Sequence, residues 1–300
     1  MISSVKMSAT LKKVQSPRSK VQGSSREQTP TNSSHRRQLL IGPWTLVLGI
    51  SLLCTPLLSA ADTSALPEAS SGAHSNRVHR IYVEAKEQFT RDPTNSQTAW
   101  QFARACFERA DFSTTDAQRG DFAEQGIAAS KRAIDLNSNS AAAYFYLGVN
   151  LGQLARTKLF TALGLLDEME VAWEKSIALD AKFHYAAAER SLGLLYLDAP
   201  GWPLSLGSRS KARQHLHKAT ECVPDYPENH LCWLEAQLKW GETKTVKAQL
   251  ATVEIVMQSA RTNLTGEQWS RDWEDWDARW KTIKAKTDGS VSIRSPRGAK

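Results

Sequence analysis

Lys131-Arg132-Ala133-Ile134-Asp135-Leu136 is the stretch that decides the fold, because its pattern recurs twice further along the chain. The copies occupy residues 174–179 and 217–222, and the small residues Ala133, Ser176 and Ala219 are 43 positions apart in both steps. Each copy leads through a short polar link into another helical run. A repeat of this kind predicts stacked supersecondary units, because each unit can bury its apolar face only against a neighbour.

Apolar residues recur at helical spacing from Asn76 onward, with almost no strand-like alternation. One helix is expected before Asp92-Pro93 and a second helix after it. Further helices are expected over about 116–136, 140–155, 158–180, 183–198, 208–222, 228–240 and 243–261. The breaks between them contain Asn, Ser, Pro or Gly, which stop helices or cap new ones. The chain is therefore predicted to be all-α.

Four tryptophans mark a further helix near the end of the chain. Trp269, Trp273, Trp276 and Trp280 are spaced by four, three and four residues, which puts all four rings on one helix face. The opposite face would carry Arg271, Asp272, Glu274, Asp275 and Arg279. We expect a C-terminal Trp-rich capping helix over 266–286, followed by a disordered tail over 287–300. The alternative is an aromatic docking face for a partner or a membrane surface.

The repeats resemble tetratricopeptide repeats (TPRs). That family has an aromatic or small residue followed by a Leu-Gly pair in the first helix, an alanine near the end of the second, and often a proline five residues later. The matching residues are Tyr144, Leu147, Gly148, Leu192, Gly193, Ala133, Ala219 and Pro224, whereas Ser176 and Ala181 replace the expected Ala and Pro. The standard unit has 34 residues, so these 43-residue units are lengthened. The resemblance implies a TPR-like α-solenoid of lengthened helical hairpins over 76–265.

A narrower resemblance rests on residues 199–208, Lys211-Ala212-Arg213 and residues 224–231. These stretches are similar to the TatT component family associated with TRAP-type (tripartite, ATP-independent) solute transport. That family is α-helical and extracytoplasmic and is thought to cooperate with a periplasmic solute-binding protein. The regulators of microtubule dynamics have similar lengthened repeats, but the leader described below argues against their setting.

The TPR resemblance also implies which residues would line a concave groove on the first helices of the pairs. Carried across, these positions are Trp100, Arg104, Phe145, Val149, Arg190, Leu194, Leu231 and Glu235, with Gln97, Gln153 and Lys239 as further candidates. Trp202, between Gly201 and Pro203, is a candidate binding tip or a buried anchor of a rigid turn. The groove is expected to accept a protein partner or an apolar ligand, unless the protein's own helices fill it.

The first 61 residues have the composition of an export signal. Residues 1–38 are basic and without periodicity, and residues 39–61 are an apolar run that ends in small residues. The twin arginines Arg36 and Arg37 also fit a twin-arginine signal. The alternative is an uncleaved membrane anchor formed by 39–58. Either route places the folded part in the bacterial periplasm or on the extracytoplasmic face of the membrane, after a linker over 62–75.

The positive charge of the chain lies in this leader. Residues 1–61 contain eight Lys or Arg and one acid, Glu27, which accounts for the net charge of +7 of all 300 residues. The remainder is balanced, so the folded part is not expected to bind nucleic acid, which requires a basic stripe.

Motifs for catalysis or metal binding are missing from the sequence. It contains no phosphate-binding loop, nucleophile elbow or zinc signature, and His215 and His217 are spaced for different helix faces. Cys222 and Cys232 could form a disulfide or be buried as small apolar residues. No cofactor is expected. The sequence predicts a non-catalytic adaptor, with a membrane-anchored assembly scaffold as the alternative and an enzyme with an unrecognised site as a remote one.

Overall fold

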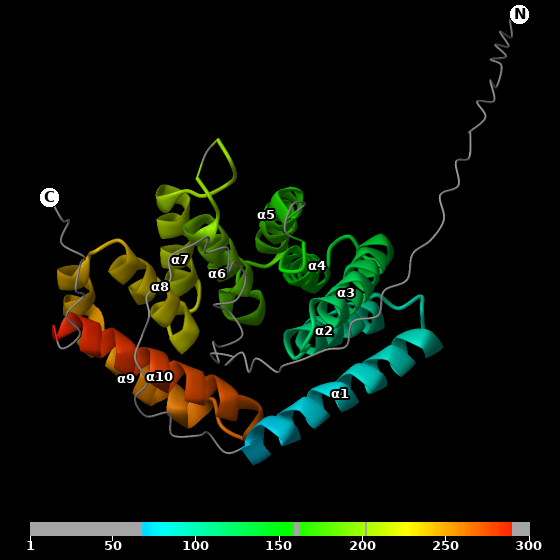
Figure 1. The fold of residues 1–300 in the computed structure, drawn as a ribbon, viewed down its shortest axis with the longest axis horizontal. Helices are drawn as coiled ribbons and strands as arrows, with labels where there is room; N and C mark the ends of the chain where they lie inside the picture. Colours follow the sequence, from blue (N-terminus) through cyan, green and yellow to red (C-terminus); the bar gives the residue numbers. More distant parts are fainter. Residues whose placement is uncertain (1–67, 159–161, 202, 290–300) are drawn as a thin grey trace, which may run out of the picture. The chain divides into compact units, whose positions relative to one another are not determined.

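The structure of the chain is a computed structural model that describes residues 68–158, 162–201 and 203–289. Within these ranges the chain is helical and forms no β-strand (Figure 1). The helices are α1 (Glu68–Arg91), α2 (Ser96–Asp111), α3 (Asp116–Leu136), α4 (Ala141–Ala155), α5 (Ala162–Leu179), α6 (Phe183–Asp198), α7 (Arg209–Cys222), α8 (Pro227–Lys239), α9 (Thr243–Asn263), the short 3₁₀ helix η1 (Glu267–Trp269) and α10 (Ser270–Thr287). All of them belong to one compact unit of the chain, Ile41–Lys300.

Helices α2, α3, α4 and α7 start at a residue whose side chain caps them. Thr115 caps α3 by accepting a hydrogen bond from the backbone N–H of Gln118 at 3.2 Å. Ser140 and Ser208 cap α4 and α7 in the same way. Each of these side chains satisfies a backbone donor that a helix leaves unpaired at its first turn.

Each helix packs against the next one, so the chain forms the hairpins α2–α3, α4–α5, α6–α7 and α8–α9 (Figure 1). The even-numbered helices also contact one another, α2 with α4, α4 with α6 and α6 with α8. The odd-numbered helices α3, α5, α7 and α9 show no comparable packing among themselves in the described ranges. We call α2, α4, α6 and α8 the even row. This stacking is that of a TPR-like solenoid and confirms the predicted fold class.

The Leu-Gly pairs of the repeat mark the closest approach between helices. A Cβ atom on Gly148 of α4 would lie 2.3 Å from Nε1 of Trp173 on α5. A Cβ on Gly193 of α6 would lie 2.5 Å from Cγ of Leu216 on α7. Only glycine fits at either position, because real Cβ contacts are never this short. The repeat signature therefore encodes how tightly the two helices of a pair cross.

The Trp-rich helix α10 packs against α8 and α9, as expected for a terminal cap. Trp276 and Trp280 are buried, and Trp269 and Trp273 are partly buried against the same cluster. The indole N–H of Trp280 donates to Glu254 on α9 at 2.9 Å, and that of Trp276 donates to Glu228 on α8 at 2.5 Å. The tryptophan face of the helix therefore packs against the core, and the buried indole N–H groups of Trp276 and Trp280 both have acceptors there.

One boundary differs from the sequence prediction. Helix α1 begins at Glu68, inside the stretch 62–75 that we expected to be a linker. Its alanines permit a helix that periodicity alone does not reveal. Helix α5 is described from Ala162, and residues 159–161, where we expect its first turn, lie outside the described residues. The expected leader over 1–61 and the tail beyond residue 289 lie outside the described residues.

Candidate binding pocket on the even row

A cavity of about 320 Å³ opens where the even row meets α1 and α10. Its lining residues combine charged and aromatic side chains. They include Arg77 of α1, Arg104, Phe107, Glu108 and Asp111 of α2, Phe112, Tyr185 of α6, Tyr226, Trp269, and Arg271 and Asp272 of α10. We call this cavity the even-row pocket. Its volume lies at the lower end of the range for small-molecule and peptide sites.

One wall of the pocket is built by an unusual backbone conformation at the start of α6. His184, Tyr185 and Ala186 have φ of 47°, 60° and 58°, so three successive residues other than glycine are left-handed. Each such residue costs about 1–2 kcal/mol. The surrounding structure must therefore hold this turn in place.

Buried polar side chains hold the turn. Arg190 donates from Nη1 to the carbonyl oxygen of Tyr185 at 3.2 Å and to Oδ1 of Asn229 at 2.5 Å. Asn229 donates from Nδ2 to the same carbonyl at 3.2 Å and to the carbonyl of Ala219 at 3.0 Å. Arg190 and Asn229 are fully buried. The strained turn thus receives donors from α6 and α8 together, which fixes the position of Tyr185.

The aromatic side chains form a continuous wall from α6 to α10. The rings of Tyr185 and Tyr226 stack with centroids 4.3 Å apart and an interplanar angle of 11°. Trp269 meets both rings edge-on, at 6.0 Å and 6.4 Å. Trp276 meets Tyr226 from the core side at 5.5 Å. We call Tyr185, Tyr226 and Trp269 the aromatic wall.

Two of the pocket's three acids are paired with arginines. Glu108 accepts from Nε of Arg104 at 2.7 Å. Asp111 lies 3.6 Å from Arg156 and 3.8 Å from Arg271. The guanidinium of Arg271 also lies 4.5 Å from the ring centre of Phe112. The α2 side of the pocket is therefore electrostatically balanced.

The third acid, Asp272, has no such partner. Among the described residues it accepts no hydrogen bond and forms no ion pair. Burial raises its pKa to about 6, with Glu228 and Asp275 acting in the same direction and Arg271 and Arg190 opposing them. At neutral pH the pocket therefore contains a desolvated carboxylate beside the aromatic wall.

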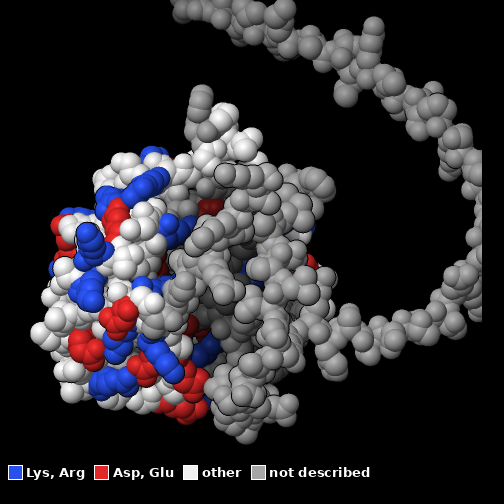
Figure 2. Space-filling view, turned by 60° about the vertical axis from the view of Figure 1, so that its left-hand side comes forward, with Lys and Arg blue, Asp and Glu red and all other residues white. Residues whose placement is uncertain are grey.

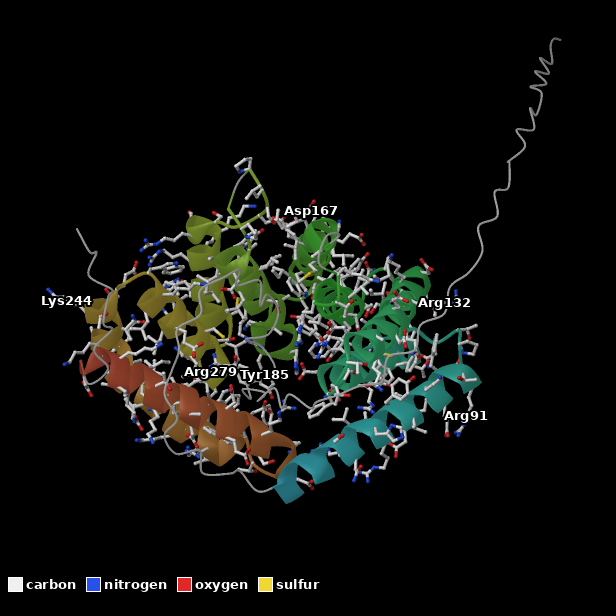
Figure 3. The ribbon with its side chains drawn as sticks, in the orientation of Figure 1. Arg91, Arg132, Asp167, Tyr185, Lys244 and Arg279 are labelled. Carbon is white, nitrogen blue, oxygen red and sulfur yellow. The ribbon has the colours of Figure 1, made fainter. Side chains whose placement is uncertain are left out.

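A buried ion cluster lies beneath this acid and joins α8 to α10. Arg279 donates to both oxygens of Glu228 at 2.8 and 2.9 Å, to Glu235 at 2.8 Å and to Asp275 at 3.0 Å. Burial alone would raise the pKa of Glu228, but Arg279 and Arg190 hold it below its usual value. Figure 3 labels Arg279, on α10, and Tyr185, near the start of α6. The cluster fixes α10, and with it Asp272, on the even row.

The predicted groove residues are distributed differently from our expectation. Arg104 does line the pocket, and Trp100 stacks on Tyr146 with centroids 5.9 Å apart. Five others are buried in the core, namely Phe145, Val149, Arg190, Leu194 and Leu231. Glu235 is engaged by Arg279, and Trp202 lies outside the described residues. Whether any of these residues binds a partner stays a prediction.

The reason for the burial is clearest at Phe145. The first turn of α6 folds over it, so that the rings of Phe183 and His184 lie 5.7 and 6.0 Å from its ring. Positions that face a groove in a shorter repeat are covered here by the neighbouring unit. The further candidates divide in the same way, since Gln153 is buried and Gln97 and Lys239 are exposed.

Sequence reasoning did not identify the aromatic wall or Asp272 as pocket residues. Tyr185 is placed by the left-handed turn and Tyr226 by the loop before α8, and neither carries a repeat signature. Helical periodicity places Asp272 and Arg279 on the face of the last helix opposite its tryptophans. The side chain of Arg279 is instead only 11% exposed, because α10 turns this arginine, as well as its tryptophans, toward α8.

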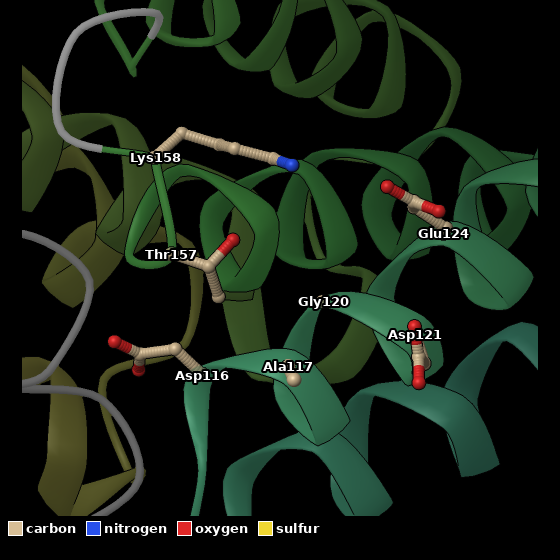
Figure 4. A pocket seen from close by; sticks show the side chains of 7 residues that line it. All are labelled: Asp116, Ala117, Gly120, Asp121, Glu124, Thr157 and Lys158. Carbon is tan, nitrogen blue, oxygen red and sulfur yellow. The ribbon is translucent and has the colours of Figure 1, made fainter. Parts of the chain in front are cut away.

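A second depression of about 230 Å³ lies between the start of α3 and the end of α4 (Figure 4). Asp116, Asp121 and Glu124 line it opposite Thr157 and Lys158. It contains no aromatic side chain, and no group of His, Cys, Asp or Glu in the described ranges could hold a metal ion. We find no second feature there that indicates a ligand.

The cysteines and histidines have structural contacts. Cys106, Cys222 and Cys232 are free thiols, so the possible disulfide between Cys222 and Cys232 is not formed. His215 lies 2.7 Å from Glu189 through Nδ1. Burial raises the pKa of Cys106 to about 12, which leaves that thiol protonated and unreactive.

Charges on the visible surface are mixed in sign. Figure 2 shows Lys and Arg side chains interspersed with Asp and Glu over the face it presents. Many of them pair across helices, as Arg209 does with Glu242 and Lys239 with Asp198, both at 2.6 Å. None of the helices in the described ranges has the length and apolar character needed to cross a bilayer.

Comparisons with known proteins found a family and solved structures that are similar to this chain. A family described as regulator of microtubule dynamics protein 1-3 matches residues 61–182, less than half of the chain. A thermophilic TPR protein from Thermus thermophilus, TTC0263, has a crystal structure that is similar over 72% of this chain and 95% of its own, with 16% identity and a TM-score of 0.52. The crystal structure of MamA is similar over 75% of this chain and 98% of its own, with 16% identity and a TM-score of 0.40. No curated protein matches the sequence. The described part of the chain is an all-α, TPR-like solenoid closed by a Trp-rich helix.

Proposed function

We propose that this chain is a non-catalytic scaffold that receives a segment of a partner protein in the even-row pocket. The observation that carries the proposal is the convergence of α1, α2, α6 and α10 on one cavity with both charged and aromatic lining. The fold is TPR-like, and stacked helical repeats of this kind form extended concave binding surfaces. Aromatic and arginine side chains in a concave site are the residue types that dominate such binding.

The proposal includes export of the folded part to the bacterial periplasm or to the outer face of the membrane. Its support is the leader, in which Arg36 and Arg37 precede the apolar run 39–58. The resemblance of residues 199–231 to the TatT component family supports a role in TRAP-type solute transport, with a solute-binding protein as the partner. A cytoskeletal partner would follow from the match to regulators of microtubule dynamics, but an export leader argues against it. N-terminal sequencing of the mature protein tests export, and a start near Asp62 would rule out an uncleaved anchor.

The binding proposal can be tested by site-specific photo-cross-linking in the cells from which the protein comes. A photoreactive amino acid replaces Gln268, which is exposed and lines the pocket. The matched control replaces Gln258, an equally exposed glutamine on α9 outside the pocket. We expect a discrete protein adduct from position 268 and none from position 258. The proposal is wrong if position 268 gives no adduct, or if both positions give the same adducts.

A further inference from the structure

We propose that the even-row pocket binds a lysine or arginine side chain of the partner segment, held between the aromatic wall and the carboxylate of Asp272. This inference rests on the proposed function and specifies the chemistry of the partner. It is carried by the pairing of charges around the pocket, by the composition of the wall, and by contacts that the same rings already make.

The charges leave one anionic position open. Glu108 and Asp111 each have an arginine partner within the pocket or beside it. Asp272 accepts no hydrogen bond and forms no ion pair among the described residues, although it lines the cavity. A desolvated carboxylate is stabilised most by a cation that enters the same space.

The surroundings of Asp272 add to this attraction. Glu228 and Asp275 act on it as further negative charges, while Arg271 and Arg190 act as positive ones. Arg271 is engaged with Asp111 and with the ring of Phe112. Arg190 is engaged with the left-handed turn. Both arginines therefore have other partners and do not replace a direct ion pair.

The aromatic wall suits a cation better than an anion. The faces of tyrosine and tryptophan attract ammonium and guanidinium groups, at about 0.5–2 kcal/mol for each contact. The rings around this pocket already do so, since Arg190 lies 5.5 Å from the ring centre of Tyr226 and Arg271 lies 4.5 Å from that of Phe112. The long aliphatic stem of a lysine or arginine can also cover apolar surface while its charged end reaches the acid.

The opposite possibility is an anionic ligand at Arg77. This arginine lines the pocket from α1 and forms no ion pair with any described residue. It stands beside Val78 and Ile81, however, and in the described ranges no second arginine or lysine without an acidic partner lines the pocket with it. Anion sites in proteins combine several such donors.

The probes are capped pentapeptides with Lys, norleucine or Glu between pairs of glycines. They are titrated into the full exported chain at low salt, and binding is followed by NMR. Lys and norleucine have similar stems, so their difference isolates the charge. We expect the Lys peptide to bind about tenfold more tightly than the norleucine peptide. Asp272→Asn should lower the ratio of the Lys to the norleucine affinity by at least about fivefold, and Arg77→Gln should change that ratio by less than about twofold. Asp272→Asn keeps the size of the side chain, and a thermal melt confirms that each variant is folded.

The other outcomes overturn the inference in distinct ways. Equal binding of the Lys and norleucine peptides, or no effect of Asp272→Asn, excludes a cation site. Tighter binding of the Glu peptide that depends on Arg77 makes it an anion site. If n-butylammonium binds as tightly as the Lys peptide, the site is one for free amines rather than for a protein side chain. The partner cross-linked at position 268 could also be captured equally well by the Asp272→Asn variant. That result would be consistent with the proposed scaffold function and would refute only this inference.

Discussion

Replacing Asp272 by asparagine should stabilise the protein at neutral pH. Its pKa of about 6 lies above the ordinary value of 3.8, chiefly because of burial. The unfolded chain therefore loses the proton first as pH rises. The free energy of unfolding should fall between about pH 4 and pH 6 and remain lower above that range.

The size of the effect follows from the shift. A difference of about two pKa units corresponds to about 3 kcal/mol. The side chain is only partly buried and faces an open pocket, so we expect about 1–2 kcal/mol after screening by solvent. This corresponds to a rise in Tm of about 2–8 °C for a domain of this size.

The assay is thermal unfolding by circular dichroism from pH 4 to pH 8. Asp272→Asn should raise Tm at pH 7.5, leave it almost unchanged at pH 4, and flatten the slope between them. Glu274→Gln is the matched control, because it removes the same charge from an exposed position of α10. A lower Tm for Asp272→Asn at pH 7.5 would refute the reasoning, because it would mean that the carboxylate makes a favourable interaction in the folded protein.

Two further predictions concern the packing of the solenoid. Gly148→Ala should destabilise the protein by about 1–3 kcal/mol in chemical denaturation, because the new Cβ would meet Trp173 at 2.3 Å. Gly164→Ala, where the new Cβ meets no atom of the described residues within 4 Å, should instead be neutral or stabilising by up to about 1 kcal/mol. The same sign at both sites would contradict this packing. Arg279→Met should cost about 3–5 kcal/mol because it leaves Glu228 buried without its partner. Adding Glu228→Gln to that variant should recover part of the loss, and full additivity of the two changes would show that the pair does not interact.

The fold could be predicted because its determinants are local and repeated. The repeat period is given by the spacing of the small residues Ala133, Ser176 and Ala219. The Leu-Gly pairs predict the close helix crossings that the structure shows at Gly148 and Gly193. Capping residues such as Ser140 predict where some of the helices start. Each of these signals depends on neighbours within one or two helices, which a single sequence displays.

The pocket could be predicted only in part, because its residues depend on contacts between distant segments. Arg104 follows from the repeat register and does line the pocket. Phe145 follows from the same register, yet the first turn of α6 buries it. That turn is left-handed at Tyr185, a conformation that no local sequence preference favours. The buried position of Arg279 could not be predicted, because helical periodicity identifies the apolar face of α10 but not the acids of α8 that contact it.

The location of the bound side chain tests the account most directly. The indole N–H signals of the ten tryptophans can be followed by NMR in protein labelled at tryptophan, with Trp269→Phe used to assign one of them. We predict that the Lys peptide shifts the signal of Trp269 in the aromatic wall and leaves that of Trp173, which is buried between α4 and α5, unchanged. A Lys peptide that binds without moving the Trp269 signal would contradict binding in the even-row pocket.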